Sequence, residues 1–267
     1  MSSRASELPE PSTVIAERGD GRKPAVFLDY DGVLSPIVDR PSDAVMTDEM
    51  RRIVSDLAGR ASVCVVSGRD RQVVTELMGL DDLVVAGSHG FDIHHPETGV
   101  ITHDASTGFE DLVERVTAEV SEQAAGIEGT LVEPKHASVA LHYRGVDAAR
   151  HAEVQELVDG VLDAHPGELR VTPGKFVHEI QPKIDWNKGK AVEHLLDVLD
   201  LRGVDVLPIY VGDDVTDEDA FNAPSIADGG LGVLVIGPTD ADERETAAAA
   251  VLADVDAVGA FLDGLAR

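Results

Sequence analysis

A pair of aspartates, Asp29 and Asp31, offers the clearest chemistry in the sequence. They follow the apolar run AVFL and precede Gly32, where the chain must turn away. At the end of a strand, one aspartate could attack a phosphorus atom as the nucleophile, while the second protonates the leaving oxygen and later activates water. An ordinary acidic turn after a strand has the same pattern, so this motif alone leaves both interpretations open.

A second group of acids, Asp213, Asp214 and Asp217, follows the apolar run VLPIYVG. Four or more carboxylates at adjacent strand ends would repel one another unless a cation neutralised them, and a set of oxygen ligands suits Mg²⁺. The cluster therefore predicts a magnesium site. The alternative is a helix N-terminus rich in acids that favour the helix dipole, which accounts for Glu218 and Asp219.

Two further polar side chains stand at the ends of predicted elements. Ser67 lies at a strand end in VVSGR, and Lys188 lies just before a helix in WNKGKAVEHLL. A phosphoryl group needs a hydrogen-bond donor and a positive charge to offset its developing negative charge, and a hydroxyl and an ammonium supply them. Without the two acidic motifs, a turn serine and an exposed lysine at a helix start would be the preferred interpretations.

Alternating strands and helices predict the scaffold that positions these residues. Short apolar runs indicate buried parallel strands at 25–30, 62–68, 83–88, 206–214 and 232–237. Cap signals and apolar residues at helical spacing predict helices at 47–57, 70–78 and 189–201. This order indicates an α/β fold with a doubly wound, Rossmann-like parallel sheet, whose ligands bind beyond the carboxyl ends of the strands.

The middle of the chain follows a different pattern. Helices are predicted near 108–127 and 147–165, and alternating polar and apolar residues predict strands at 130–134, 138–144, 169–173 and 175–182. A helix, two strands, a helix and two strands indicate a small α+β module inserted into the larger sheet. We therefore expect a core over 24–107 and 183–267, an inserted domain over 108–182, and a polar N-terminal extension or disordered tail over 1–23.

The composition excludes several classes of function. Fifty acidic residues against 22 basic ones give a formal net charge of −28, which repels nucleic acid and anionic lipid and resembles proteins adapted to concentrated salt. The chain has no apolar run near the roughly 18 residues of a membrane span and no signal-peptide pattern, so we expect a cytoplasmic protein. We also expect a monomer that binds neither nucleic acid nor membrane. The single cysteine, Cys64, lies in an apolar run and is expected to be buried.

Taken in chain order, the four signatures resemble those of the haloacid dehalogenase superfamily, and the resemblance covers about residues 25–240. It implies that Asp29 is the nucleophile and Asp31 the general acid and base. It also implies that the phosphate is held by Ser67, Gly68 and Lys188, the last of which belongs to the catalytic residues as well.

The same resemblance implies a set of metal ligands. Mg²⁺ would be bound by the Asp29 carboxylate, the Asp31 backbone carbonyl and Asp213, with Asp214 or Asp217 ligating directly or through water.

Within that superfamily, the chain resembles the trehalose-6-phosphate phosphatase family. The stretches that carry the resemblance are DYDGVLSPI, SGR, AGSHGFDI, VEPKHASVALHYR, HEIQP and GDDVTDEDAF. The family's activity implies that the inserted module is a cap domain and that the chain hydrolyses trehalose 6-phosphate to trehalose and phosphate through an aspartyl-phosphate, the last step of trehalose biosynthesis. The residues implied in substrate binding are Arg69, His89, Gly90, Glu133, Lys135, Arg144 and Glu179.

Several alternatives stay open at this point. Glu133 and Lys135 could form a surface ion pair of little energetic value, and His89 could equally be a turn histidine. Gln181 stands where many relatives carry a basic residue, which leaves one sugar or phosphate contact in doubt. The substrate could instead be sucrose-phosphate or mannosyl-3-phosphoglycerate. A non-catalytic sugar-phosphate sensor is disfavoured because both Asp29 and Asp31 are present, and a receiver domain is disfavoured by the insert.

Overall fold

The computed structural model describes residues 3–18, 21–38, 40–103, 108–174, 176–237 and 244–267. The chain divides into two compact units. The first joins Met1–Ile101 to Trp186–Arg267, and the second is the intervening stretch Thr102–Asp185.

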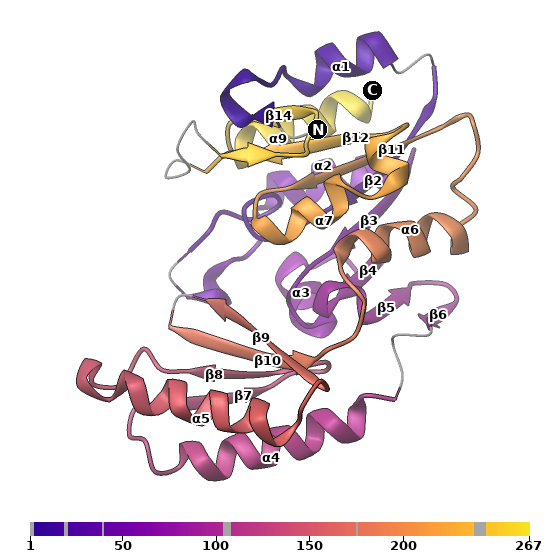
Figure 1. Cartoon of the computed structure of the whole chain (residues 1–267). Helices are drawn as coiled ribbons and strands as arrows, with labels where there is room; N and C mark the ends of the chain where they lie inside the picture. The colour runs from indigo at the N-terminus through magenta and orange to yellow at the C-terminus, as the bar shows by residue number, and fades with distance from the viewer. Residues whose placement is uncertain (1–2, 19–20, 39, 104–107, 175, 238–243) are drawn as a thin grey trace. The chain divides into compact units, whose positions relative to one another are not determined.

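The first unit is built on an eight-stranded sheet (Figure 1). Six neighbouring strands run parallel, in the order β14 (Ala250–Leu252), β12 (Leu231–Val235), β11 (Val206–Gly212), β2 (Lys23–Leu28), β3 (Ser62–Val66) and β4 (Val84–Gly87). Alternate side chains of β2 enter different cores, Val26 and Leu28 on one face and Ala25 and Phe27 on the other. Burial on both faces explains why these strands are continuous apolar runs in the sequence.

Helices cover both faces of this sheet, so the predicted doubly wound α/β fold is confirmed. The core on the Val26 face is closed by α1 (Pro11–Arg18), α2 (Asp48–Ala58), α3 (Arg71–Met78) and α9 (Val255–Leu265). The core on the Phe27 face is closed by α6 (Lys188–Val198), α7 (Glu218–Phe221) and α8 (Pro224–Ala227). Cys64 is buried in this second core, as predicted.

Two antiparallel strands that the sequence did not predict extend the sheet beyond β4. They are β5 (Asp92–His95) and β6 (Gly99–Ile101). Only Ile93 of β5 is fully buried, so these strands carry too few apolar residues for a clear periodic signal.

Residues 1–23 were expected to be an extension or a disordered tail, and the described part of this segment is an ordered extension, which corrects the second alternative. Within the described residues, β1 (Ser3–Arg4) pairs with β13 (Glu245–Thr246), and α1 packs on the sheet. Ala5 and Val14 are buried, with 1% and 5% of their surface exposed. The segment contains only a few apolar residues, but Ala5, Leu8, Val14 and Ile15 each pack in or against a core.

The second unit has a four-stranded antiparallel sheet with two helices on one face (Figure 1). The strands, in sheet order, are β7 (Leu131–Pro134), β8 (Val139–His142), β10 (Val177–Pro182) and β9 (Leu169–Gly174), and the helices are α4 (Glu110–Ala124) and α5 (His151–Ala164). The apolar side chains of the strands pack against the helices. This is the predicted order of a helix, two strands, a helix and two strands.

Candidate active site

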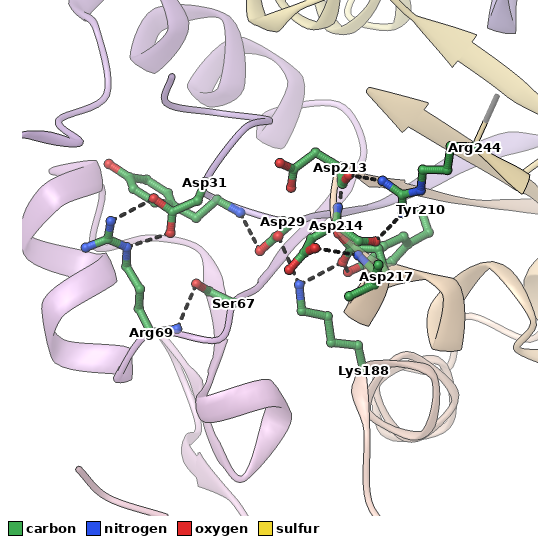
Figure 2. A network of polar contacts seen from close by, with 12 residues as sticks. Asp29, Asp31, Ser67, Arg69, Lys188, Tyr210, Asp213, Asp214, Asp217 and Arg244 are labelled. Atoms are coloured by element: carbon green, nitrogen blue, oxygen red, sulfur yellow. Dashed lines mark hydrogen bonds and ion pairs between the residues drawn. The ribbon is translucent and has the colours of Figure 1, made fainter. Parts of the chain in front are cut away.

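Three neighbouring strands of the first unit end where the candidate catalytic residues begin. Asp213 follows β11, Asp29 follows β2 and Ser67 follows β3, and these strands are adjacent and parallel. Their carboxyl ends therefore meet at one edge of the sheet. Lys188 opens α6, where the side chain of Asn187 caps the helix by accepting a hydrogen bond from the Lys190 amide. The Lys188 side chain reaches the same edge (Figure 2).

The ammonium of Lys188 lies between two carboxylates. Its Nζ is 2.9 Å from Oδ2 of Asp29 and 2.7 Å from Oδ1 of Asp217, and the lysine is 2% exposed. Burial alone would lower the pKa of Lys188, but the two carboxylates outweigh it and hold that pKa above its ordinary value. Lys188 is therefore a permanent positive charge in this site.

Asp217 is the fully buried centre of this network. Its Oδ1 accepts hydrogen bonds from Lys188 Nζ and from the Tyr210 hydroxyl at 2.6 Å, and its Oδ2 accepts from the amides of Asp213 and Asp214 at 2.9 Å each. Burial opposes its ionisation, but Lys188 outweighs that effect and lowers the pKa of Asp217. Because four donors occupy its two oxygens, Asp217 is suited to fixing its neighbours in place.

The environment of Asp213 differs from that of Asp217, because among the described residues no donor neutralises its carboxylate. One carboxylate oxygen each from Asp29, Asp213 and Asp217 lies within 4.8 Å of the others. Burial, followed by the charge of Asp29, raises the pKa of Asp213 to about 8. In the described part of the chain, no hydrogen-bond donor engages the Asp213 carboxylate. The close approach needs Gly32, which has a φ of +73° and at which a Cβ would lie 2.1 Å from Asp213 Oδ2.

The chemistry of this group fits a divalent cation. Three carboxylates and one ammonium leave a net charge of −2 when all are ionised, and no described residue donates a hydrogen bond to the oxygens of Asp213. Burial is also the largest cause that raises the pKa of Asp29, to about 7, so a cation would help keep it ionised. Asp214 lies outside the group, because its side chain is exposed and caps the turn at Val215. A ligand role for Asp214 and for the Asp31 carbonyl stays a prediction.

The Asp31 carboxylate is paired with Arg69. The guanidinium donates from Nε to Oδ2 at 2.6 Å and from Nη2 to Oδ1 at 2.7 Å, and its Nη1 donates to the Pro41 carbonyl. The ring of Tyr30 lies 5.9 Å from the guanidinium carbon. Arg69 thus contacts Asp31, the predicted general acid and base. Its contact with the substrate stays a prediction.

A tightly folded backbone surrounds Ser67 and the turn Ser88–Gly90. The Ser67 hydroxyl accepts from the Arg69 amide, and the Ser67 carbonyl accepts from the His89 amide at 2.8 Å. His89 and Gly90 both have positive φ, and a Cβ on Gly68 would lie 2.8 Å from the His89 ring. A histidine held in the left-handed region is strained, and such strain persists only where its surroundings impose it. The roles of these residues in binding stay predictions.

Comparison with known proteins decides the family. The family model described as Trehalose-phosphatase matches residues 27–255. The chain belongs to the trehalose-phosphatase family. A "Probable trehalose-phosphate phosphatase 2" from Oryza sativa subsp. japonica is 43% identical over 244 residues, which are 83% of this chain and 64% of that protein.

A further relative agrees, and a solved structure shares the fold. A trehalose-phosphate phosphatase from Mycobacterium bovis is 39% identical, over 99% of this chain and 67% of its own length. The chain thus spans about two thirds of the length of these relatives. The solved C-terminal domain of the C. albicans trehalose-6-phosphate phosphatase shares the fold, with a TM-score of 0.76 at 24% identity over 99% of both chains.

The second unit of this trehalose-phosphatase family member carries the remaining candidates. Glu133 and Glu179 both pair with Ala140 across the sheet, so they share one face, opposite the helices. Lys135 Nζ lies 3.4 Å from Glu179 Oε1, and Glu133 contacts His142. The structure therefore brings Glu179 and Lys135 together and disfavours the alternative of a Glu133–Lys135 surface ion pair. Arg144 lies instead beside the Phe176 ring, at 5.8 Å.

Sequence reasoning missed two residues that shape the site. Tyr210 was assigned only to a buried strand, although a hydroxyl in such a strand needs a partner, which is a usable signal. Arg244 had no signal at all. Its guanidinium donates to the carbonyls of Asp213 and Asp214 across 31 and 30 positions of the sequence.

Proposed function

We propose that this chain is a Mg²⁺-dependent phosphatase that hydrolyses trehalose 6-phosphate to trehalose and phosphate, the last step of trehalose biosynthesis. The observation that carries the proposal is the buried Asp29–Lys188–Asp217 network, with Asp213 beside it, in a chain of the trehalose-phosphatase family. A buried carboxylate held by an ammonium at a strand end is suited to nucleophilic attack on a phosphoryl group.

In the proposed first step, an Asp29 carboxylate oxygen bonds to phosphorus while the bond from phosphorus to the sugar oxygen breaks. Asp31 gives its proton to the departing sugar oxygen, and Lys188 offsets the negative charge on the transferring group. Asp31 is now paired to Arg69, so this proton transfer requires that ion pair to open. Ser67 and the Gly68 amide would donate hydrogen bonds to the phosphate.

In the second step, water attacks the phosphorus of the aspartyl-phosphate, and Asp31 takes up the proton that the water loses. Phosphate leaves and the Asp29 carboxylate is restored, so atoms and charge balance over the cycle. Asp29, Asp213 and the Asp31 carbonyl would hold Mg²⁺, with Asp214 or Asp217 ligating directly or through water. When bound there, the ion would offset the charge of the phosphoryl group and of the surrounding carboxylates.

We propose further that the second unit, within boundaries near 108–182, is a cap domain that recognises the sugar part of the substrate. Glu133, Lys135, Glu179 and Arg144 supply charged groups that can exchange several hydrogen bonds with hydroxyl groups. His89 and Gly90, with Arg69, would complete the substrate contacts from the first unit.

The cellular setting follows from the same proposal. Among the described residues, no helix has the length and apolar character needed to cross a bilayer. We propose a cytoplasmic monomer whose partner is a small sugar phosphate, since a net charge of −28 disfavours nucleic acid and anionic membranes.

A phosphate-release screen with purified protein, with and without Mg²⁺, tests this function. We expect trehalose 6-phosphate to be the preferred substrate and EDTA to abolish release. A preference for sucrose-phosphate or mannosyl-3-phosphoglycerate would place the chain with another sugar-phosphate substrate. Binding of trehalose 6-phosphate without turnover would instead identify a sensor.

A further inference from the structure

The backbone of Asp213 and Asp214 is held by two side chains of opposite charge. Asp217 accepts hydrogen bonds from both amides, at 2.9 Å each. Arg244 donates from Nη1 to the Asp213 carbonyl and from Nη2 to the Asp214 carbonyl at 2.7 Å. Both amides and both carbonyls of this dipeptide are therefore occupied, so the backbone that carries the Asp213 carboxylate has little freedom to move.

Arg244 is itself braced. Its Nη2 lies 3.2 Å from Glu218 Oε1, the other Glu218 oxygen accepts from the Ala247 amide, and 19% of the Arg244 side chain is exposed. The Arg244 carbonyl accepts from the Ala5 amide, at the point where β1 pairs with β13. Glu218 of α7 thus holds the guanidinium, and the N-terminal segment holds the backbone of Arg244.

A guanidinium suits this position for a geometric reason. Its rigid fork can donate to two neighbouring carbonyls at once, whereas the ammonium of a lysine is a single point of charge. The Asp213 carboxylate has no donor of its own among the described residues, so its placement depends on its backbone. Groups that orient a metal ligand in this way typically change metal affinity 10- to 100-fold when they are lost.

We propose that Arg244 is a positioning residue for Asp213, which it holds in place for a divalent cation without touching the reacting atoms. The inference rests on the proposed function, because it assigns Arg244 to the metal site of that same reaction. It predicts that loss of the guanidinium weakens binding of Mg²⁺ and leaves recognition of the sugar unchanged.

The test compares Arg244→Met with Arg51→Met. Arg51 is a matched control, because it also donates to two carbonyls, those of Met46 and Met78, and pairs with one carboxylate, that of Asp48. Its side chain is 27% exposed, close to the value for Arg244. The measurement is the midpoint of thermal unfolding as a function of Mg²⁺ concentration, together with kcat and KM at saturating Mg²⁺.

We expect Arg244→Met to need 10- to 100-fold more Mg²⁺ for half of the thermal shift. KM at saturating Mg²⁺ should stay at the wild-type value, and Arg51→Met should lower the melting temperature without changing the Mg²⁺ requirement. Arg244→Lys, which keeps the charge without the fork, should fall between wild type and Arg244→Met, and it decides the matter if the methionine variant does not fold.

An unchanged Mg²⁺ requirement in both Arg244 variants would overturn the positioning role alone. A wild-type protein whose melting temperature and phosphate release both ignore Mg²⁺ would overturn the proposed function, and the role of Arg244 with it.

Discussion

At the scale of single residues, Lys188 shows how charge and burial decide the site. An ammonium that is 2% exposed is stable only because Asp29 and Asp217 lie within 3 Å of it. Strand-end placement in the sequence was enough to expect Asp29 and Asp213 near one another, and the resemblance to the superfamily added Lys188 from a helix start. Which of the later acids would turn inward was not predictable, because it depends on the 3-10 turn Val215–Asp217. The pairing of Asp31 with Arg69 spans 38 positions and left no sequence signal.

Removal of the Lys188 charge should destabilise the protein. Lys188→Met leaves two buried carboxylates without their cation, and breaking such a pair costs about 3 kcal/mol of unfolding free energy. Urea unfolding at neutral pH measures the loss, with the exposed Lys23→Met as a control that should change stability by less than about 0.5 kcal/mol. The double variant Lys188→Met/Asp217→Asn should be more stable than the two single effects predict, and simple additivity would contradict this account.

Stability of the metal-free protein should fall as pH rises. Asp29 and Asp213 have pKa values raised to about 7 and about 8 from 3.8, so between pH 4 and 8 the folded state binds more protons than the unfolded state. Their contribution to the unfolding free energy is therefore present at acid pH and lost as pH rises through 7 to 8. Mg²⁺ competes with these protons, so the thermal shift that it produces should grow with pH.

The check is the melting temperature from pH 5 to 8.5, with EDTA and with Mg²⁺. Asp213→Asn removes one of the two titrating groups and should flatten the pH dependence of the difference between the two curves. A Mg²⁺ shift that is larger at pH 5 than at pH 8 would be incompatible with the proposed competition.

At the scale of elements, the sequence predicted what is apolar and periodic. The parallel strands β2, β3, β4, β11 and β12 and the helices α2 to α6 appear close to their predicted bounds, because each has a continuous apolar run or an apolar stripe. The strand β14 and the helices α1, α7, α8 and α9 were not predicted. The strands β1, β5 and β6 were not predicted, because each is short and contributes few buried side chains. The N-terminal segment was misjudged for the same reason. Its order comes from pairing with β13 and from isolated contacts such as Val14.

The N-terminal helix should contribute to the stability of the first unit. Val14 is 5% exposed, so Val14→Ala removes two buried methyl groups and should cost about 1.5 kcal/mol of unfolding free energy. Ser12→Ala, at an exposed position of the same helix, is the matched control and should have little effect. Equal urea midpoints for Val14→Ala and the wild type would mean that this helix is detached in solution.

At the scale of the whole molecule, composition and order of elements carried the fold class. Strands that alternate with helices predict the doubly wound sheet, and the change to half-buried strands between them predicts the inserted module. The placement of the antiparallel strands at the sheet edge and the long-range contact of Arg244 could not be predicted, because they are set by tertiary packing between distant segments.

The net charge should make stability depend on salt. At a net charge of −28, repulsion between acidic side chains opposes the compact state. Raising the ionic strength from about 0.1 M to 1 M shortens the Debye length from about 10 Å to 3 Å, which screens this repulsion. We expect the melting temperature to rise over this range of KCl, measured with EDTA present so that no divalent ion contributes. A higher melting temperature at the lower salt concentration would show that local ion pairs outweigh the net repulsion.

The most direct measurement of the central claim is to quench the reaction with acid during turnover of trehalose 6-phosphate with Mg²⁺, and to map phosphorylated peptides by mass spectrometry. We predict a phosphoryl group on the peptide that contains Asp29, and its loss, together with turnover, in Asp29→Asn. Continued hydrolysis by Asp29→Asn, or wild-type turnover with a phosphoryl group on a different residue, would contradict the account.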